Sequence, residues 1–164
     1  MLAGELYQAS DPELVRERLF AREVVQALNS SSPTDPENRL ALLGKLMGKM
    51  GKNPWIEPPF FCDYGYNISL GEDCFFNFNC VVLDVCEVKL GDRVLIGPAV
   101  QLYTATHPLD AATRGALWEF GKPIEITNTS LYGYEGGLFE NGKPIQAETK
   151  LNLPKLSSLT SDKF

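Results

Sequence analysis

The stretch "LGDRVLIGPAVQLYTATH", residues 90–107, divides into three units of six residues, LGDRVL, IGPAVQ and LYTATH. The first position of each unit is aliphatic and the fifth is small; these positions hold Leu90, Ile96 and Leu102, and Val94, Val100 and Thr106. Such a period is typical of a parallel β-helix, in which each side sends one large side chain to the axis and a small one to the corner. Ordinary alternating strands would explain a period of two but not of six. The sequence therefore predicts a parallel β-helix.

The four cysteines follow the same period upstream. Every sixth residue from position 62 is small or apolar: Cys62, Ile68, Cys74, Cys80 and Cys86. There is no CxxC pair, and one histidine cannot complete a usual zinc site, so no metal is expected. A disulfide framework is not expected in an intracellular chain. We interpret the cysteines as small hydrophobic residues that pack at the corners of the coil.

Composition excludes two classes of partner. The chain has 164 residues and a formal net charge of −6, whereas a nucleic-acid binder needs a basic face. No apolar run approaches the ~20 residues that a membrane span needs. The first residues lack the basic and apolar regions of a secretory signal, so we expect the protein in the cytoplasm.

The residues before the coil have helical spacing. The tripeptide DPE occurs at 11–13 and again at 35–37, and each begins a predicted helix with proline in its first turn. Ser10 and Glu13 form a predicted capping box for the first helix. The second is expected to place four residues on one stripe: Leu40, Leu43, Met47 and Met50. We therefore expect a helical region over 1–57 and a β-helix over 58–126 with an excursion loop at 103–123.

Four segments in this order resemble the maltose/galactoside O-acetyltransferase family, and maltose acetyltransferases most of all. They are AGELY (3–7), CDYGYNISLG (62–71), NFNCVVLDVC (77–86) and YTATHPLD (103–110). The resemblance covers residues 1–126. It implies a left-handed β-helix, a homotrimer with active sites between adjacent subunits, and acetyl transfer from acetyl-CoA to a hydroxyl of a sugar such as maltose or glucose.

The resemblance also implies functional residues. His107, the only histidine, matches the catalytic histidine within ATHP, and imidazole is a suitable general base near neutral pH. Asn77 matches the residue that stabilises the tetrahedral intermediate, which an amide donor can do. The alternative for Asn77 is a plain corner asparagine with positive φ, a role for which Asn79 is the other candidate.

Two aspartates match positions at or beside the acceptor contacts, so Asp63, Asp84 and Asn77 are the predicted substrate-binding residues. For both aspartates, turn chemistry at a corner of the coil remains an alternative. No acetyl-CoA contacts can be assigned.

The chain departs from the family pattern after residue 126. Residues 127–164 hold no six-residue period, and we expect a poorly ordered tail there. At about 18 residues per turn, residues 58–126 without the excursion would make fewer than three turns. In the family the later turns carry most of the acetyl-CoA contacts, so we expect this chain to bind acetyl-CoA weakly or not at all.

Two other functions stay open. A truncated, non-catalytic relative could associate with full-length subunits, and a sugar-binding module could retain the acceptor site alone. A β-helical carbonic anhydrase is excluded, because its three-histidine zinc site cannot be built from one histidine. Binding of acetyl-CoA would distinguish an enzyme from a non-catalytic relative.

Overall fold

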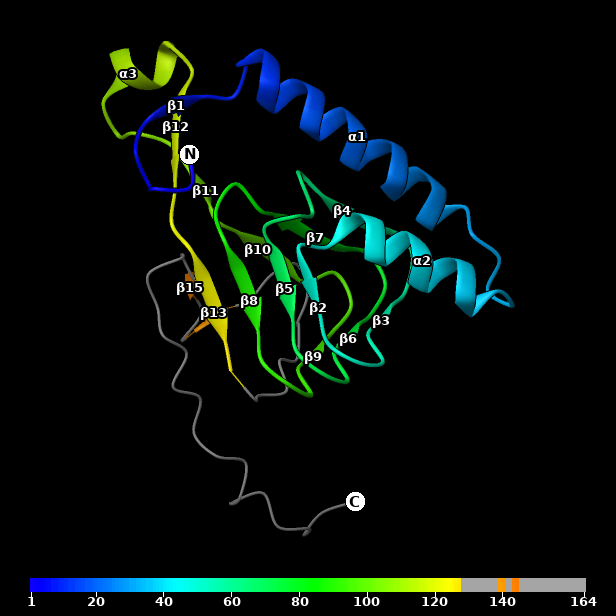
Figure 1. Cartoon of the computed structure of the whole chain (residues 1–164). Coiled ribbons are helices and arrows are strands. Elements are labelled where there is room, and N and C mark those ends of the chain that lie inside the picture. The colour runs from blue at the N-terminus through cyan, green and yellow to red at the C-terminus, as the bar shows by residue number, and fades with distance from the viewer. Residues whose placement is uncertain (128–138, 141–142, 145–164) are drawn as a thin grey trace, which may run out of the picture.

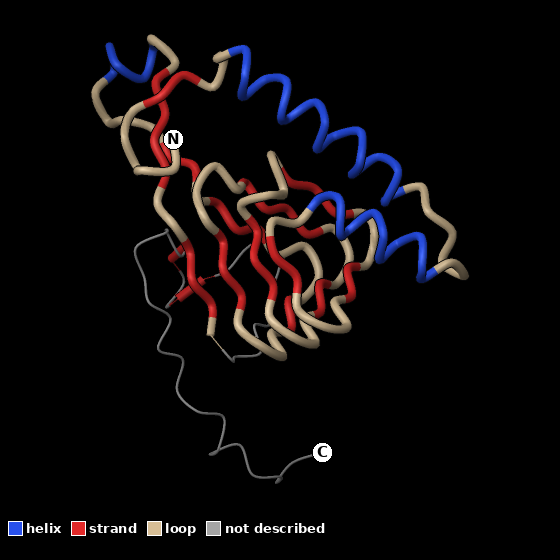
Figure 2. The backbone as a smooth tube through the Cα atoms, viewed as in Figure 1, coloured by secondary structure: helices blue, strands red, loops and turns tan. Residues whose placement is uncertain are grey.

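The structure, a computed structural model, describes residues 1–127, 139–140 and 143–144. Two helices, α1 (Pro12–Asn29) and α2 (Pro36–Leu46), lie along one side of a coil of short strands (Figures 1 and 2). The side chains of Asp11 and Asp35 cap them, accepting from the N–H groups of Glu13 at 2.9 Å and Asn38 at 3.1 Å. The predicted capping box placed the N-cap of α1 at Ser10. In the structure the N-cap is Asp11.

The coil consists of three parallel sheets. The first contains β2 (Lys49–Met50), β5 (Ile68–Leu70), β8 (Val88–Leu90) and β13 (Ile124–Ile126). The second contains β3 (Trp55–Ile56), β6 (Phe75–Phe76) and β9 (Leu95–Ile96). The third contains β4 (Phe60–Cys62), β7 (Cys80–Leu83) and β10 (Gln101–Tyr103). The predicted parallel coil is therefore present.

The predicted interior positions are buried and stack from turn to turn. Leu70 lies opposite Leu90, Phe76 opposite Ile96, and Val82 opposite Leu102, each pair 20 residues apart and at most 3% exposed. The intervals along one turn are six, six and eight residues, because the corner after the third sheet is two residues longer than the other two. The sequence estimate of about 18 residues per turn missed this corner.

The coil also begins earlier than residue 58. Met50 pairs with Leu70 and Ile56 with Phe76, so β2 and β3 already belong to the first turn. Helix α2 ends at Leu46, which leaves Met50 in a strand and not on the predicted helical stripe. The coil therefore has a strand of each sheet in three successive turns, and β13 adds a fourth strand to one sheet.

A second layer lies at one end of the coil. After β10 the chain forms β11 (Ala105–Thr106), α3 (Ala111–Gly115) and β12 (Trp118–Gly121), then returns to the coil as β13. The N-terminal strand β1 (Tyr7–Gln8) pairs antiparallel with β12, giving a sheet in the order β1–β12–β11 (Figure 1). Thr106, predicted to be an inward corner residue, is exposed here, and Thr104 is buried instead.

Of the predicted tail, the structure describes the pair β14 (Phe139–Glu140) and β15 (Lys143–Pro144), which are antiparallel. The expectation of a poorly ordered segment otherwise lies outside the described residues. Within the described part of the chain, no helix combines the length and apolar character that crossing a membrane requires.

Candidate active site

His107 directly follows β11 and is exposed. Strand β11 is fixed by antiparallel pairing, with Ala105 opposite Gly121 and Thr106 opposite Phe120. The imidazole has no hydrogen-bond partner among the described residues, so no structural bond explains its presence there. An exposed histidine at the end of a paired strand can exchange a proton with a bound molecule.

Asn77 lies at the corner between β6 and β7. Its N–H donates to the Ile96 carbonyl at 2.9 Å, and its side-chain Oδ1 accepts from the Phe78 N–H at 2.8 Å. These bonds fix the amide while its Nδ2 has no acceptor among the described residues. Asn79, with φ of 63°, is the residue at this corner in the left-handed conformation. The plain corner role thus belongs to Asn79, and Asn77 keeps an available donor.

Asn77 and His107 lie at opposite ends of one sheet. Asn77 precedes β7, whereas His107 comes after the carboxyl end of β10, and β7 and β10 are parallel neighbours (Figure 1). The strand length therefore separates the two side chains within one chain.

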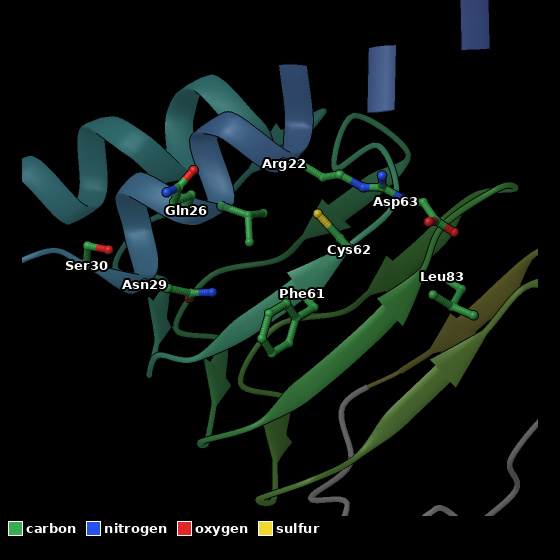
Figure 3. A pocket seen from close by; sticks show the side chains of 9 residues that line it. Arg22, Gln26, Asn29, Ser30, Phe61, Cys62, Asp63 and Leu83 are labelled. Atoms are coloured by element: carbon green, nitrogen blue, oxygen red, sulfur yellow. The ribbon is translucent and has the colours of Figure 1, made fainter. Parts of the chain in front are cut away.

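Asp63 lies at the same end of the sheet as His107, just after β4. It lines a pocket of about 510 Å³ between α1 and the third sheet, with Arg22 extending from α1 toward it (Figure 3). The other lining residues are Val25, Gln26, Asn29, Ser30, Phe61, Cys62 and Leu83. Burial raises the pKa of Asp63, and the nearby charges of Arg18 and Arg22 partly counteract it. A carboxylate beside a guanidinium in a partly apolar pocket can bind a hydroxylated ligand. The lining includes neither Asn77 nor His107.

Asp84 is fully buried at the long corner of the coil. Its Oδ1 accepts from the N–H groups of Asp63 at 3.0 Å and Tyr64 at 2.9 Å, and its Oδ2 has no partner among the described residues. Burial raises the pKa of Asp84 to about 6 against the opposing effect of these backbone bonds. The carboxyl group holds the preceding turn in place and cannot meet a ligand from solvent in this conformation. This geometry favours the alternative of corner chemistry over the predicted acceptor contact.

The cysteines are free thiols and all buried. The Cys74 thiol donates to the Gly91 carbonyl at 3.1 Å, and the Cys80 thiol to the Asn77 carbonyl at 3.1 Å. Burial raises the pKa of each thiol, as expected of packing residues rather than nucleophiles. Among the described residues no group of three histidine, cysteine or acidic side chains could hold a metal ion.

Sequence reasoning missed Arg22, which the fold brings to Asp63 from 41 positions away in the chain. Arg22 lies in a helix with many charged residues, and nothing in its local pattern distinguishes it from Arg16. Only the packing of α1 on the coil selects it. The same holds for Tyr7 and Glu119, which are 112 positions apart and share a hydrogen bond of 2.8 Å.

Comparison with known proteins gives a consistent result. Residues 1–51 match the family model described as the maltose acetyltransferase hexapeptide capping motif. Nodulation protein L of Rhizobium meliloti is 46% identical over 126 residues, which cover 77% of this chain and 69% of that protein. Galactoside O-acetyltransferase of Escherichia coli is 35% identical, with 80% of this chain and 64% of that protein covered. The chain thus spans about two thirds of the length of these curated relatives.

Solved structures agree with these relatives. A maltose O-acetyltransferase from Clostridium difficile 630 has a TM-score of 0.79 and 41% identity, covering 80% of this chain and 71% of that one. A galactoside acetyltransferase in complex with coenzyme A has a TM-score of 0.75 and 33% identity, covering 78% and 64%. The similarity confirms the predicted fold class, a mainly β fold of parallel sheets like that of hexapeptide-repeat acetyltransferases. The chain belongs to the maltose/galactoside O-acetyltransferase family of hexapeptide-repeat acyltransferases.

Proposed function

We propose that this protein transfers the acetyl group of acetyl-CoA to a hydroxyl of a sugar acceptor, for which maltose and glucose are the first candidates. Two proteins similar to it are named as O-acetyltransferases, and a hexapeptide-repeat acetyltransferase from Vibrio cholerae, 38% identical, was solved with acetyl-CoA. One observation carries the residue assignment. The only histidine of the chain is exposed and makes no structural hydrogen bond to a described residue.

In the proposed mechanism, His107 removes the proton from the acceptor hydroxyl as the oxygen attacks the thioester carbonyl. Asn77 Nδ2 and a backbone N–H donate to the oxyanion that develops on that carbonyl. The carbon–sulfur bond then breaks, and the imidazolium of His107 returns the proton to the departing thiolate. No covalent acyl-enzyme is needed, so the kinetics should show a ternary complex and not ping-pong exchange.

Asp63 is the proposed acceptor contact, because its carboxylate lines a pocket at the same end of the sheet as His107. Burial raises the pKa of Asp63, but the nearby charges of Arg18 and Arg22 oppose this and favour the ionised form, which accepts hydrogen bonds from sugar hydroxyls. Asp84 has only a supporting role in the proposal. Its carboxylate accepts hydrogen bonds from the N–H groups of Asp63 and Tyr64 and so holds the backbone next to the pocket.

The separation of Asn77 from His107 favours a homotrimer in which neighbouring copies complete each site. The outward residues of the second and third sheets are largely apolar and include Trp55, Phe75 and Leu95, and Phe61, Val81 and Tyr103. The first sheet instead presents Lys49, Ser69, Lys89 and Glu125. Apolar faces on both sides of the corner that carries Asn77 suit contact between subunits there. The reaction is placed in the cytoplasm, without nucleic acid or membrane as a partner.

The test is consumption of acetyl-CoA with maltose or glucose by the wild type and by His107→Ala. Whatever transfer the wild type shows should be lost in the variant, with sugar binding unchanged. A variant that keeps more than a tenth of the wild-type rate would contradict the assignment of His107 as the general base. A wild type that binds sugar but no acetyl-CoA would favour a sugar-binding module. One that binds neither would favour the non-catalytic relative.

A further inference from the structure

The segment that carries His107 is held from the opposite side by the amino terminus of the chain. Strand β11 ends one residue before His107 and pairs with β12, and the far edge of β12 pairs with β1. In this register Tyr7 lies opposite Glu119 and Gln8 opposite Trp118. We name residues 1–8 the N-terminal strap.

One partly buried side-chain hydrogen bond joins the strap to β12. The Tyr7 hydroxyl donates to Glu119 Oε2 at 2.8 Å, and Tyr7 is only 8% exposed. Burial, and after it the hydrogen bond to Glu119, raises the pKa of Tyr7 far above its ordinary value, so the hydroxyl keeps its proton. A phenol donating to a carboxylate is a strong hydrogen bond when water is excluded.

Apolar contacts extend the strap to the coil and to β11. Tyr7, Tyr64 and Val85 form a small cluster apart from the main core, and Ala105 of β11 packs against it. The strap also approaches the end of β12 at Gly4, where φ is 75° and an added Cβ would lie 3.3 Å from the Gly121 carbonyl. A larger residue at position 4 would therefore be strained and would press on the end of β12.

We propose that the N-terminal strap is a positioning element for His107, with Tyr7 and Glu119 as its principal residues. The strap fixes β12, β12 fixes β11, and β11 sets the direction in which the imidazole leaves the sheet. This inference rests on the proposed function only where it predicts an effect on acetyl transfer. The effect on the position of His107 stands apart from it.

The chain provides a matched control. Tyr66 also donates its hydroxyl to a glutamate, Glu17 Oε2, at 2.7 Å, but this bond joins the coil to α1 and touches neither β11 nor β12. Tyr7→Phe and Tyr66→Phe each remove one tyrosine–glutamate bond and keep the ring. Their difference isolates what the Tyr7 bond does for the loop of His107.

The experiment follows His107 by NMR, since the only histidine of the chain gives an unambiguous imidazole signal. In Tyr7→Phe we expect this signal to shift or broaden and the amide of Thr106, which lies opposite Phe120 in the ladder, to exchange with solvent about tenfold faster. Tyr66→Phe should leave both as in the wild type. The maximal rate of transfer should fall about tenfold in Tyr7→Phe, with the Michaelis constant for sugar unchanged.

Two results would overturn the proposal. The His107 signal and the β11 exchange rates could be unchanged in Tyr7→Phe, or Tyr66→Phe could alter them as much. The NMR measurement needs no turnover. The proposal for the strap can therefore hold even if the protein does not transfer acetyl groups. Conversely, if His107 is needed for transfer but its NMR signal is unchanged in Tyr7→Phe, only the positioning role of the strap is rejected.

Discussion

The coil and the layer formed by β1, β12 and β11 are stabilised in different ways. In the coil, each large side chain meets its equivalent from the next turn, as Phe76 meets Ile96, so local periodicity and packing agree. In the layer, Tyr7 meets Glu119 from 112 positions away, and the sheet has no repeat. The coil is thus a rigid scaffold, and the layer is the part where a few specific contacts place a functional side chain.

The largest expected effect comes from removing a large side chain from the interior of the coil. Phe76 is 1% exposed and packs edge-to-face on Phe60, with ring centroids 5.8 Å apart. Phe76→Ala should lower the free energy of unfolding by about 3–5 kcal/mol, because the stacked turns around it cannot collapse into the cavity. Urea unfolding measures this.

Leu109→Ala is the matched truncation in the excursion, where the side chain is 98% exposed. It should change the free energy of unfolding by less than about 0.5 kcal/mol. Equal losses in Phe76→Ala and Leu109→Ala would contradict the division between scaffold and layer.

A smaller effect concerns the buried Asp84 at the corner between the two regions. Its pKa is raised from 3.8 to about 6, so the folded state binds the proton more tightly and stability is lost as pH rises through this window. Ionisation of the folded protein therefore costs about 3 kcal/mol. Asp84→Asn keeps an oxygen acceptor for the two N–H groups but cannot ionise.

We expect the free energy of unfolding of Asp84→Asn, relative to wild type, to rise by about 2.5 kcal/mol between pH 4 and pH 7.5, since part of the full effect is already present at pH 4. Urea unfolding at a series of pH values checks this. A constant difference between the two proteins across that range would show that the Asp84 carboxyl does not carry the burial cost.

Asn77→Ala should lower the maximal rate of transfer about 100-fold with little change in the Michaelis constant for sugar, since an oxyanion donor acts in the transition state. Asn79→Gly is its control, because glycine tolerates the φ of 63° found there. We expect the control to transfer acetyl at close to the wild-type rate. An unchanged maximal rate with a raised Michaelis constant in Asn77→Ala would make Asn77 a ground-state sugar contact.

The sequence predicted the interior of the coil well, because Leu90, Ile96 and Leu102 repeat locally and each buries an aliphatic side chain. It missed β2 and β3, since strands of two residues among glycines and prolines hold too little pattern to reveal a period. It also could not distinguish the roles of two nearby aspartates. Asp63 lines a pocket and Asp84 is fully buried, and only the corner geometry separates them.

The most direct test measures urea unfolding and acetyl transfer on the same preparation of His107→Ala. If His107 is an exposed base on a rigid scaffold, the free energy of unfolding should stay within about 0.5 kcal/mol of wild type while transfer to maltose or glucose is lost. A variant that is destabilised by more than about 1 kcal/mol, or that still transfers at over a tenth of the wild-type rate, would contradict this role.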